Sequence, residues 1–99
     1  MFPGGGMGNM QAMMKKVQKM QNDMLKAQEE LKKRTVEATV GGGAVTVVVS
    51  GRKELVSIKI NPDAVDLEDI EMLEDMIVSA VNDGIRQADE MSEKEMAKI

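Results

Sequence analysis

The chain has 99 residues, a net charge of −4, no cysteine, no histidine and one aromatic residue, Phe2. A chain of this length forms one domain with a core of marginal size. Without cysteine there is no disulfide framework or thiolate chemistry, and without histidine the commonest general base and zinc ligand is missing. We find neither a signal peptide nor an apolar stretch near the ~20 residues of a membrane span, so we expect a cytoplasmic protein.

Charge is divided unevenly along the sequence. Residues 1–34 carry seven basic and three acidic side chains, whereas residues 63–99 carry three basic and twelve acidic ones. The net negative charge alone argues against a polyanionic partner. The basic N-terminal third nevertheless creates a local field of the opposite sign.

The N-terminal third is predicted to form a tail and a long helix. Residues 1–9, MFPGGGMGN, are glycine-rich and predict a flexible tail. Over residues 10–33, apolar side chains recur at alternating spacings of three and four, the heptad pattern of a helix that packs against another helix. These positions are Met10, Met13, Val17, Met20, Met24, Ala27 and Leu31.

A helix over residues 10–33 is too long to lie entirely on a small sheet. It would span about 36 Å, against about 20 Å for a strand of six residues. Its N-terminal half is therefore predicted to project, and its apolar seam then needs a partner. We expect a second subunit to cover Met13, Val17, Met20 and Met24.

Methionine is concentrated in this region, with seven of the eleven residues in the first 24 positions. Methionine favours helices and adapts to irregular gaps, so a helix–helix seam accounts for nearly all of them. A Cu(I) site of thioethers from Met7, Met10 and Met13 is the less favoured alternative.

Three strands are predicted at residues 36–40, 44–50 and 55–60, each with one apolar and one largely polar face. Gly41, Gly42 and Gly43 supply positions free to adopt positive φ in a hairpin turn, and residues 51–54 turn the chain again. The strands predict a three-stranded antiparallel meander with open edges that another chain can extend.

A second long helix is predicted at residues 67–96, with Asp66 and Asp69 as an approximate capping box. Its buried stripe comprises Ile70, Leu73, Ile77, Val81, Gly84, Ala88 and Met91. The predicted fold is α+β, in the order α-β-β-β-α, with the sheet covered on one face by two long helices. Residues 10–96 form a single domain.

No residue pattern indicates catalysis. The serines lack a recognisable partner base, and the acids of the second helix do not match the Asp-x-Asp-x-Asp-Gly calcium loop. The glycine turn lacks the Gly-Lys-Ser/Thr of a phosphate loop and precedes a strand, not a helix. We therefore expect no enzyme activity, cofactor, metal or small-molecule substrate.

Duplex DNA is a better candidate partner than single-stranded nucleic acid, which is usually bound by aromatic stacking. Lysines along a helix can meet DNA phosphates without reading bases. An equally favoured interpretation of the composition is that these lysines only solubilise an exposed helix. The candidate DNA-binding residues are Lys15, Lys16, Lys19, Lys26, Lys32, Lys33, Arg34, Arg52 and Lys53.

An ordered set of segments supports the DNA interpretation. The Met-, Gln- and Lys-rich first helix leads into VEATVGGGAVTVVVSGRKELVSIKINPDAV, and an acidic helix, LEDMIVSAVNDGIRQADE, follows. Over residues 10–90 this set resembles the YbaB/EbfC family of bacterial nucleoid-associated proteins. The resemblance implies an α-β-β-β-α fold, a tweezer-like dimer with protruding helices, and binding of duplex DNA in nucleoid organisation or gene regulation. It assigns no individual DNA contacts.

Two hypotheses follow. In the first, the chain is a non-enzymatic homodimer that binds duplex DNA and is associated with the nucleoid. In the second, it is a protein-interaction module that uses the Met-rich seam or the acidic helix, without direct DNA binding. The −9 charge of residues 63–99 favours the second, because that segment repels DNA.

Overall fold

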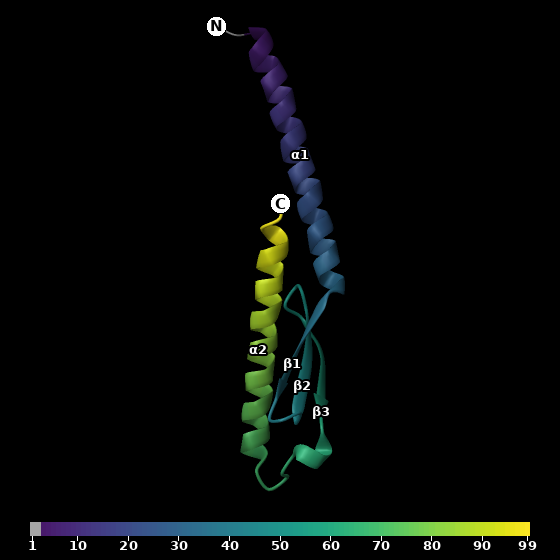
Figure 1. The fold of residues 1–99 in the computed structure, drawn as a ribbon, viewed down its shortest axis with the longest axis vertical. Helices are drawn as coiled ribbons and strands as arrows, with labels where there is room; N and C mark the ends of the chain where they lie inside the picture. Colours follow the sequence, from purple (N-terminus) through teal and green to yellow (C-terminus); the bar gives the residue numbers. More distant parts are fainter. Residues whose placement is uncertain (1–2) are drawn as a thin grey trace.

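Two long helices and a three-stranded sheet make up the computed structural model, which describes the backbone of residues 3–99 and the side chains of residues 9–99 (Figure 1). The order of elements confirms the predicted α-β-β-β-α fold. The elements are α1 (Pro3–Lys33), β1 (Thr35–Val40), β2 (Val45–Ser50), β3 (Leu55–Ile60), the 3-10 turn η1 (Pro62–Ala64) and α2 (Ile70–Met96).

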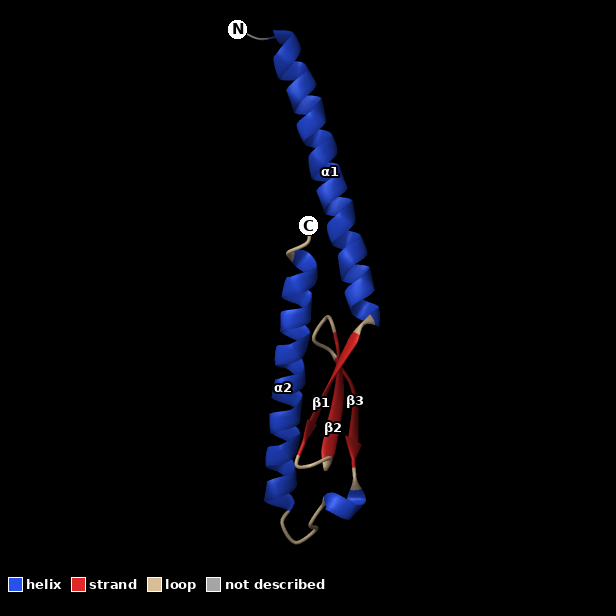
Figure 2. Ribbon diagram, viewed as in Figure 1, coloured by secondary structure: helices blue, strands red, loops and turns tan. Residues whose placement is uncertain are grey.

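The sheet is an antiparallel meander in the order β1-β2-β3, as predicted (Figure 2). Gly41, Gly42 and Gly43 all have positive φ in the turn between β1 and β2, a conformation that costs glycine least. The pairing of β2 with β3 is shifted between Val48 and Val49, so one residue of β3 bulges near its start.

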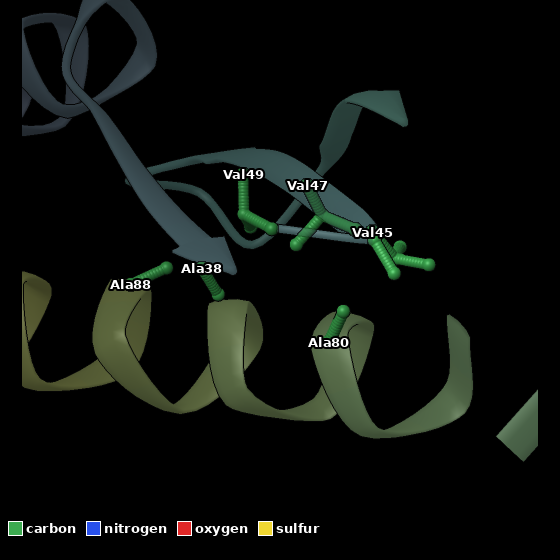
Figure 3. Close-up of a cluster of buried hydrophobic side chains, with 7 residues drawn as sticks. Ala38, Val45, Val47, Val49, Ala80 and Ala88 are labelled. Atoms are coloured by element: carbon green, nitrogen blue, oxygen red, sulfur yellow. The ribbon is translucent and has the colours of Figure 1, made fainter. Parts of the chain in front are cut away.

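The core lies between β2 and α2. Val45, Val47 and Val49 are fully buried, and Figure 3 shows their side chains directed towards Ala80 and Ala88 of α2. Alternate residues of a strand share a face, which places all three valines on one side of β2. Small residues on α2 let the helix approach the strand closely and bury these valines.

Only α2 covers the sheet, which corrects the predicted cover by two helices. It packs across β1 and β2, whereas every residue of β3 is exposed. Helix α1 meets the body only near its C-terminal end (Figure 1). The reason is its connection: α1 ends at Lys33 and β1 begins at Thr35, so only Arg34 links them. One residue cannot reverse the chain and fold the helix back onto the sheet, since such loops usually need several residues.

The two helices begin at other residues than the sequence indicates. Helix α1 starts at Pro3 instead of Met10; proline is well tolerated at a first helical position. The first two residues of the predicted tail lie outside the described residues. Helix α2 starts at Ile70, capped by the Asp69 carboxylate, which accepts a hydrogen bond from the Met72 N–H at 3.1 Å.

The end of α1 is fixed to the turn between β2 and β3. Leu31 is 2% exposed, and the Gly51 N–H donates to the carbonyl oxygens of Leu31 (3.0 Å) and Arg34 (2.9 Å). A side chain at position 51 would collide with the Leu31 carbonyl. The Arg34 guanidinium also pairs with Glu95 of α2 at 2.6 Å. Beyond this junction α1 projects freely, and the molecule measures 79 × 21 × 15 Å.

The close approach at Gly84 is testable by adding one methyl group. A Cβ at this position would lie 2.7 Å from Cγ2 of Val49 and 3.1 Å from Cγ2 of Val47. Gly84→Ala should lower the free energy of unfolding by about 1–3 kcal/mol through overpacking, although alanine is the better helix former. Urea denaturation at one protein concentration measures the effect. Ser79→Ala, on the exposed side of α2, is the control and should be neutral or slightly stabilising.

The ion pairs of Glu95 predict a pH dependence. Hydrogen bonds from Lys98 and Arg34 hold the pKa of the Glu95 carboxyl below its ordinary value of 4.5. Their stabilising contribution is therefore present above that value and is lost as the pH falls through the lower, folded-state pKa. In an NMR titration, Lys98→Gln or Arg34→Gln should raise the Glu95 midpoint, whereas Lys94→Gln should not. An unchanged midpoint in both variants would contradict the ion pairs.

Candidate nucleic-acid interface

Four basic residues of α1 form one row along the helix. Lys15, Lys19, Lys26 and Lys33 are separated by four, seven and seven residues, which places them within about 40° of one another around the axis. All four are exposed. At 1.5 Å per residue the row extends over about 27 Å. We call these four residues the lysine row; all four are among the DNA-binding candidates of the sequence analysis.

The apolar seam of α1 lies on the opposite side of the helix from the lysine row. Val17 and Met24 are each two residues from a lysine of the row, a rotation of about 160–200°. The seam is uncovered in the single chain, with Met13 64%, Val17 51%, Met20 50% and Met24 43% exposed. A partner that covered the seam would leave the lysine row free. The seam as a dimer interface stays a prediction.

Two other candidates on or near α1 are held in ion pairs. The Lys32 ammonium lies 3.3 Å from Glu29 of the same helix, and Arg34 is paired with Glu95. Lys16 is rotated by about 100° from Lys15 and stands outside the row. Surface ion pairs are weak, so Lys32 and Arg34 can exchange a carboxylate for a phosphate at small cost.

Arg52 and Lys53 lie in the turn between β2 and β3, at the base of α1. The Ser50 hydroxyl oxygen accepts from the Arg52 and Glu54 N–H groups at 3.3 and 3.2 Å and fixes this turn. Lys53 has a φ of 66°, and its ammonium lies 2.7 Å from Asp89. The hydrogen bond to Asp89, with its negative charge, raises the pKa of Lys53. Arg52 shares a shallow depression with Lys32 and so extends the basic surface of α1 onto the body.

The sequence analysis missed two basic residues near this surface. Lys94, in the last turn of α2, and Lys98, two residues after its end, line the same depression as Arg34. The sequence analysis did not include them among the candidates because residues 63–99 as a whole are strongly acidic. Basic residues in the last turn of a helix are a recognised signal, but the neighbourhood of Arg34 depends on tertiary contacts.

One group of acidic residues lies far from the lysine row. Residues 63–75 contain seven carboxylates and lie around η1 and the start of α2. Figure 1 shows these elements at the end of the molecule opposite α1. This arrangement keeps these seven of the chain's seventeen acidic side chains beyond the Debye length of about 8 Å at physiological ionic strength. The acidic segment therefore does not cancel the field along the projecting part of α1.

Other classes of site find little support in the part of the chain that the structure describes. No three acidic side chains there converge in a geometry suited to a metal ion. The side chain of Met7, a member of the alternative copper site, lies outside the described side chains. Across residues 3–99, neither helix has a stretch long and apolar enough to span a bilayer.

Comparisons with known proteins agree with this geometry. The model of the YbaB/EbfC DNA-binding family matches residues 7–99. A nucleoid-associated protein from Alkaliphilus metalliredigens is 59% identical over 99% of this chain and 87% of the relative. One from Desulforamulus reducens is 61% identical over 93% of this chain and 88% of the relative.

A solved structure has the same fold. The crystal structure of an uncharacterized protein from Helicobacter pylori superposes with a TM-score of 0.70 and 29% identity. The superposition covers 79% of this chain and 82% of the other. Together with the family match over nearly the whole sequence, this shows that the chain belongs to the YbaB/EbfC DNA-binding family.

Proposed function

We propose that this protein binds duplex DNA as a homodimer, without catalysis, and that phosphate contacts from the lysine row of α1 dominate the interaction. The observation that carries the proposal is the row itself: four exposed lysines on one side of a helix that projects from the body. The relatives are named nucleoid-associated proteins, which supports a location at the nucleoid in the bacterial cytoplasm. A role in nucleoid organisation or gene regulation is part of this proposal.

The dimensions of the lysine row suit a duplex. Its length of about 27 Å corresponds to about eight base pairs at 3.4 Å per step. Flexible lysine side chains carry compact charges that meet phosphates in many geometries. Such contacts position a protein without reading bases, so any sequence preference would come from the shape and deformability of the DNA.

A second subunit would increase the affinity by engaging the same duplex twice. Two linked binding sites raise the effective local concentration of the second one. The apolar seam at Met13, Val17, Met20 and Met24 supplies a surface for the partner. Because the seam lies opposite the lysine row, covering it leaves every lysine of the row available to DNA.

The second candidate function, a protein-interaction module, is favoured by the same uncovered seam. Unprotected methionine side chains adapt to varied apolar partners. A pull-down from lysate treated with nuclease separates the two functions. Protein partners that survive the treatment support the module, whereas partners that disappear with the nucleic acid support DNA binding.

The lysine row predicts that DNA affinity falls steeply with salt and that this dependence weakens when lysines of the row are replaced. The combined variant Lys15→Glu and Lys19→Glu should weaken binding to unrelated duplexes by a similar factor of at least ten. It should also reduce the slope of log K against log salt by about 1 for each lysine–phosphate interaction removed. Fluorescence anisotropy over a salt series measures both quantities.

The control is a double variant with the same change in net charge, made on the body of the protein instead of on α1. Lys59→Glu with Arg86→Glu alters the net charge equally but lies outside α1. It should retain most of the affinity and the wild-type slope. Equal losses of affinity in the two double variants would mean that net charge, and not the lysine row, determines binding.

The seam predicts the behaviour of the dimer. At micromolar concentration the wild type should sediment as a dimer. Met20→Asp should raise the dimer dissociation constant at least tenfold, because a carboxylate in an apolar contact loses its hydration. Asn22→Asp adds the same charge away from the seam and should have little effect. A monomeric wild type would overturn the proposed homodimer.

A further inference from the structure

The carboxylate of Glu95 joins the end of α2 to the base of α1. Its Oε1 atom lies 2.6 Å from Nη1 of Arg34, the single residue between α1 and β1, and 3.2 Å from Nζ of Lys98. Arg34 and Glu95 are 61 residues apart in the sequence, so their pairing depends on the tertiary structure. The Glu95 side chain is 24% exposed, the lowest value among the described ion-paired side chains. It is therefore held between two cations instead of extending freely into water.

Two attachments hold the base of α1. The first is on the turn between β2 and β3, where the Gly51 N–H donates to the carbonyl oxygens of Leu31 and Arg34. The second is on α2, whose C-terminal end lies beside α1 in Figure 1. Among the described residues, the Arg34–Glu95 pair is the one hydrogen bond or ion pair between α2 and residues 9–34. Because the two attachments join α1 to different elements, the loss of the second leaves α1 free to swing about the first.

A single surface pair can set the direction of α1 because little else opposes a swing. The side chains of residues 10–22 are all exposed, so moving this half of the helix disrupts no packing within the chain. Exposed ion pairs contribute little to folding, but even a weak pair changes the populations of directions that differ little in free energy. The pair is present at neutral pH, since hydrogen bonds from Lys98 and Arg34 hold the pKa of Glu95 below its ordinary value.

The direction of α1 affects DNA binding at two places. Arg52 extends the basic surface onto the body, so one duplex reaches it together with the lysine row only over a narrow range of directions. In a dimer, two rows engage the same duplex only when the span between them matches it, and the gain from two linked sites is lost when the geometry forbids both contacts. A helix that swings must also be ordered on binding, which costs affinity.

Charge alone predicts the opposite role for Glu95. Its carboxylate lines the same depression as Arg34, Lys94 and Lys98, where a negative charge repels a phosphate. Replacing Glu95 with glutamine removes this repulsion and frees Arg34 for the DNA. If Glu95 acted only through its charge, its removal would therefore strengthen binding. The sign of the change in affinity distinguishes a repelling charge from a group that holds α1 in place.

We propose that Glu95 is a positioning residue of the DNA interface: it acts through Arg34 to hold α1 in the direction that binds a duplex. This role rests on the DNA binding of the proposed function and needs no contact between Glu95 and DNA. An acidic residue of α2 thus supports the binding of a polyanion by a basic helix.

Residual dipolar couplings of the backbone amides test the positioning in the free protein. In a weakly aligned sample they report the direction of α1 and its degree of order relative to the sheet and α2. The two degrees of order should match in the wild type, and that of α1 should fall by about a quarter or more in Glu95→Gln. Glu90→Gln is the control, because it removes a charge from the same depression without breaking the pair with Arg34. It should leave the order of α1 unchanged.

DNA affinity supplies the second measurement. By fluorescence anisotropy, Glu95→Gln should bind a duplex about threefold more weakly, although it has one negative charge fewer than the wild type. Glu90→Gln loses the same charge and should bind as tightly as the wild type or more tightly. The slope of log K against log salt should stay at the wild-type value in both variants, since neither removes a lysine–phosphate contact.

An exchange of the two charges tests whether Glu95 acts through Arg34. The single variants Arg34→Glu and Glu95→Arg each break the pair, and each should lower the order of α1. The combined variant restores opposite charges at the two positions and should recover much of the order. A local disturbance at either position would not be reversed by a substitution at the other. Circular dichroism of each variant reports whether the chain is folded.

The outcomes separate this role from the proposed function. A Glu95→Gln variant with the wild-type order of α1, or with equal or higher DNA affinity, overturns the positioning role and leaves DNA binding standing. Equal losses of order in Glu90→Gln and Glu95→Gln also overturn it, as does a combined exchange with no more order than the single variants. A wild type that does not bind duplex DNA overturns the proposed function, whatever the order of α1.

Discussion

The contact between α2 and the valines of β2 is the interaction on which the other features depend. Ala80, Gly84 and Ala88 present almost no side chain, so the helix lies directly against Val47 and Val49. A helix this close buries a strand efficiently but covers a narrow width of sheet. Helix α2 covers β1 and β2, and β3 remains exposed. The small core and the exposed apolar residues of β3 therefore both result from this packing.

The packed body, the basic and apolar surfaces of α1 and a group of carboxylates lie in different parts of the molecule. The sheet and α2 form the stable body, while α1 carries basic residues on one side and an apolar seam on the other. The carboxylates of residues 63–75 lie at the opposite end of a 79 Å molecule. These seven carboxylates are thus too distant to weaken the field of the lysine row, because screening makes the local charge decisive over such distances.

The sequence was sufficient for the fold order, the strands and the meander. Alternating valines and the glycine turn specify β1 and β2 to within one residue, since both signals are local. The predicted cover by α1 was wrong because it depended on the single linking residue, Arg34. The lysine row followed from helical spacing. The proximity of Lys94 and Lys98 to Arg34 could not be predicted, because it arises from the packing of α2 against β1.

Helix α1 is attached to the body only near its C-terminal end, so a small rotation there moves its far end by a larger distance. From Leu31 to Met10 the helix extends about 32 Å, and the described side chains from Met10 to Asn22 are all exposed. A rotation of about 10° at the junction displaces the far end by about 5 Å, comparable to one helical turn. A small rotation at the junction near Gly51 therefore changes the position of the lysine row considerably, and α1 can adjust to the shape of a ligand while the sheet stays unchanged.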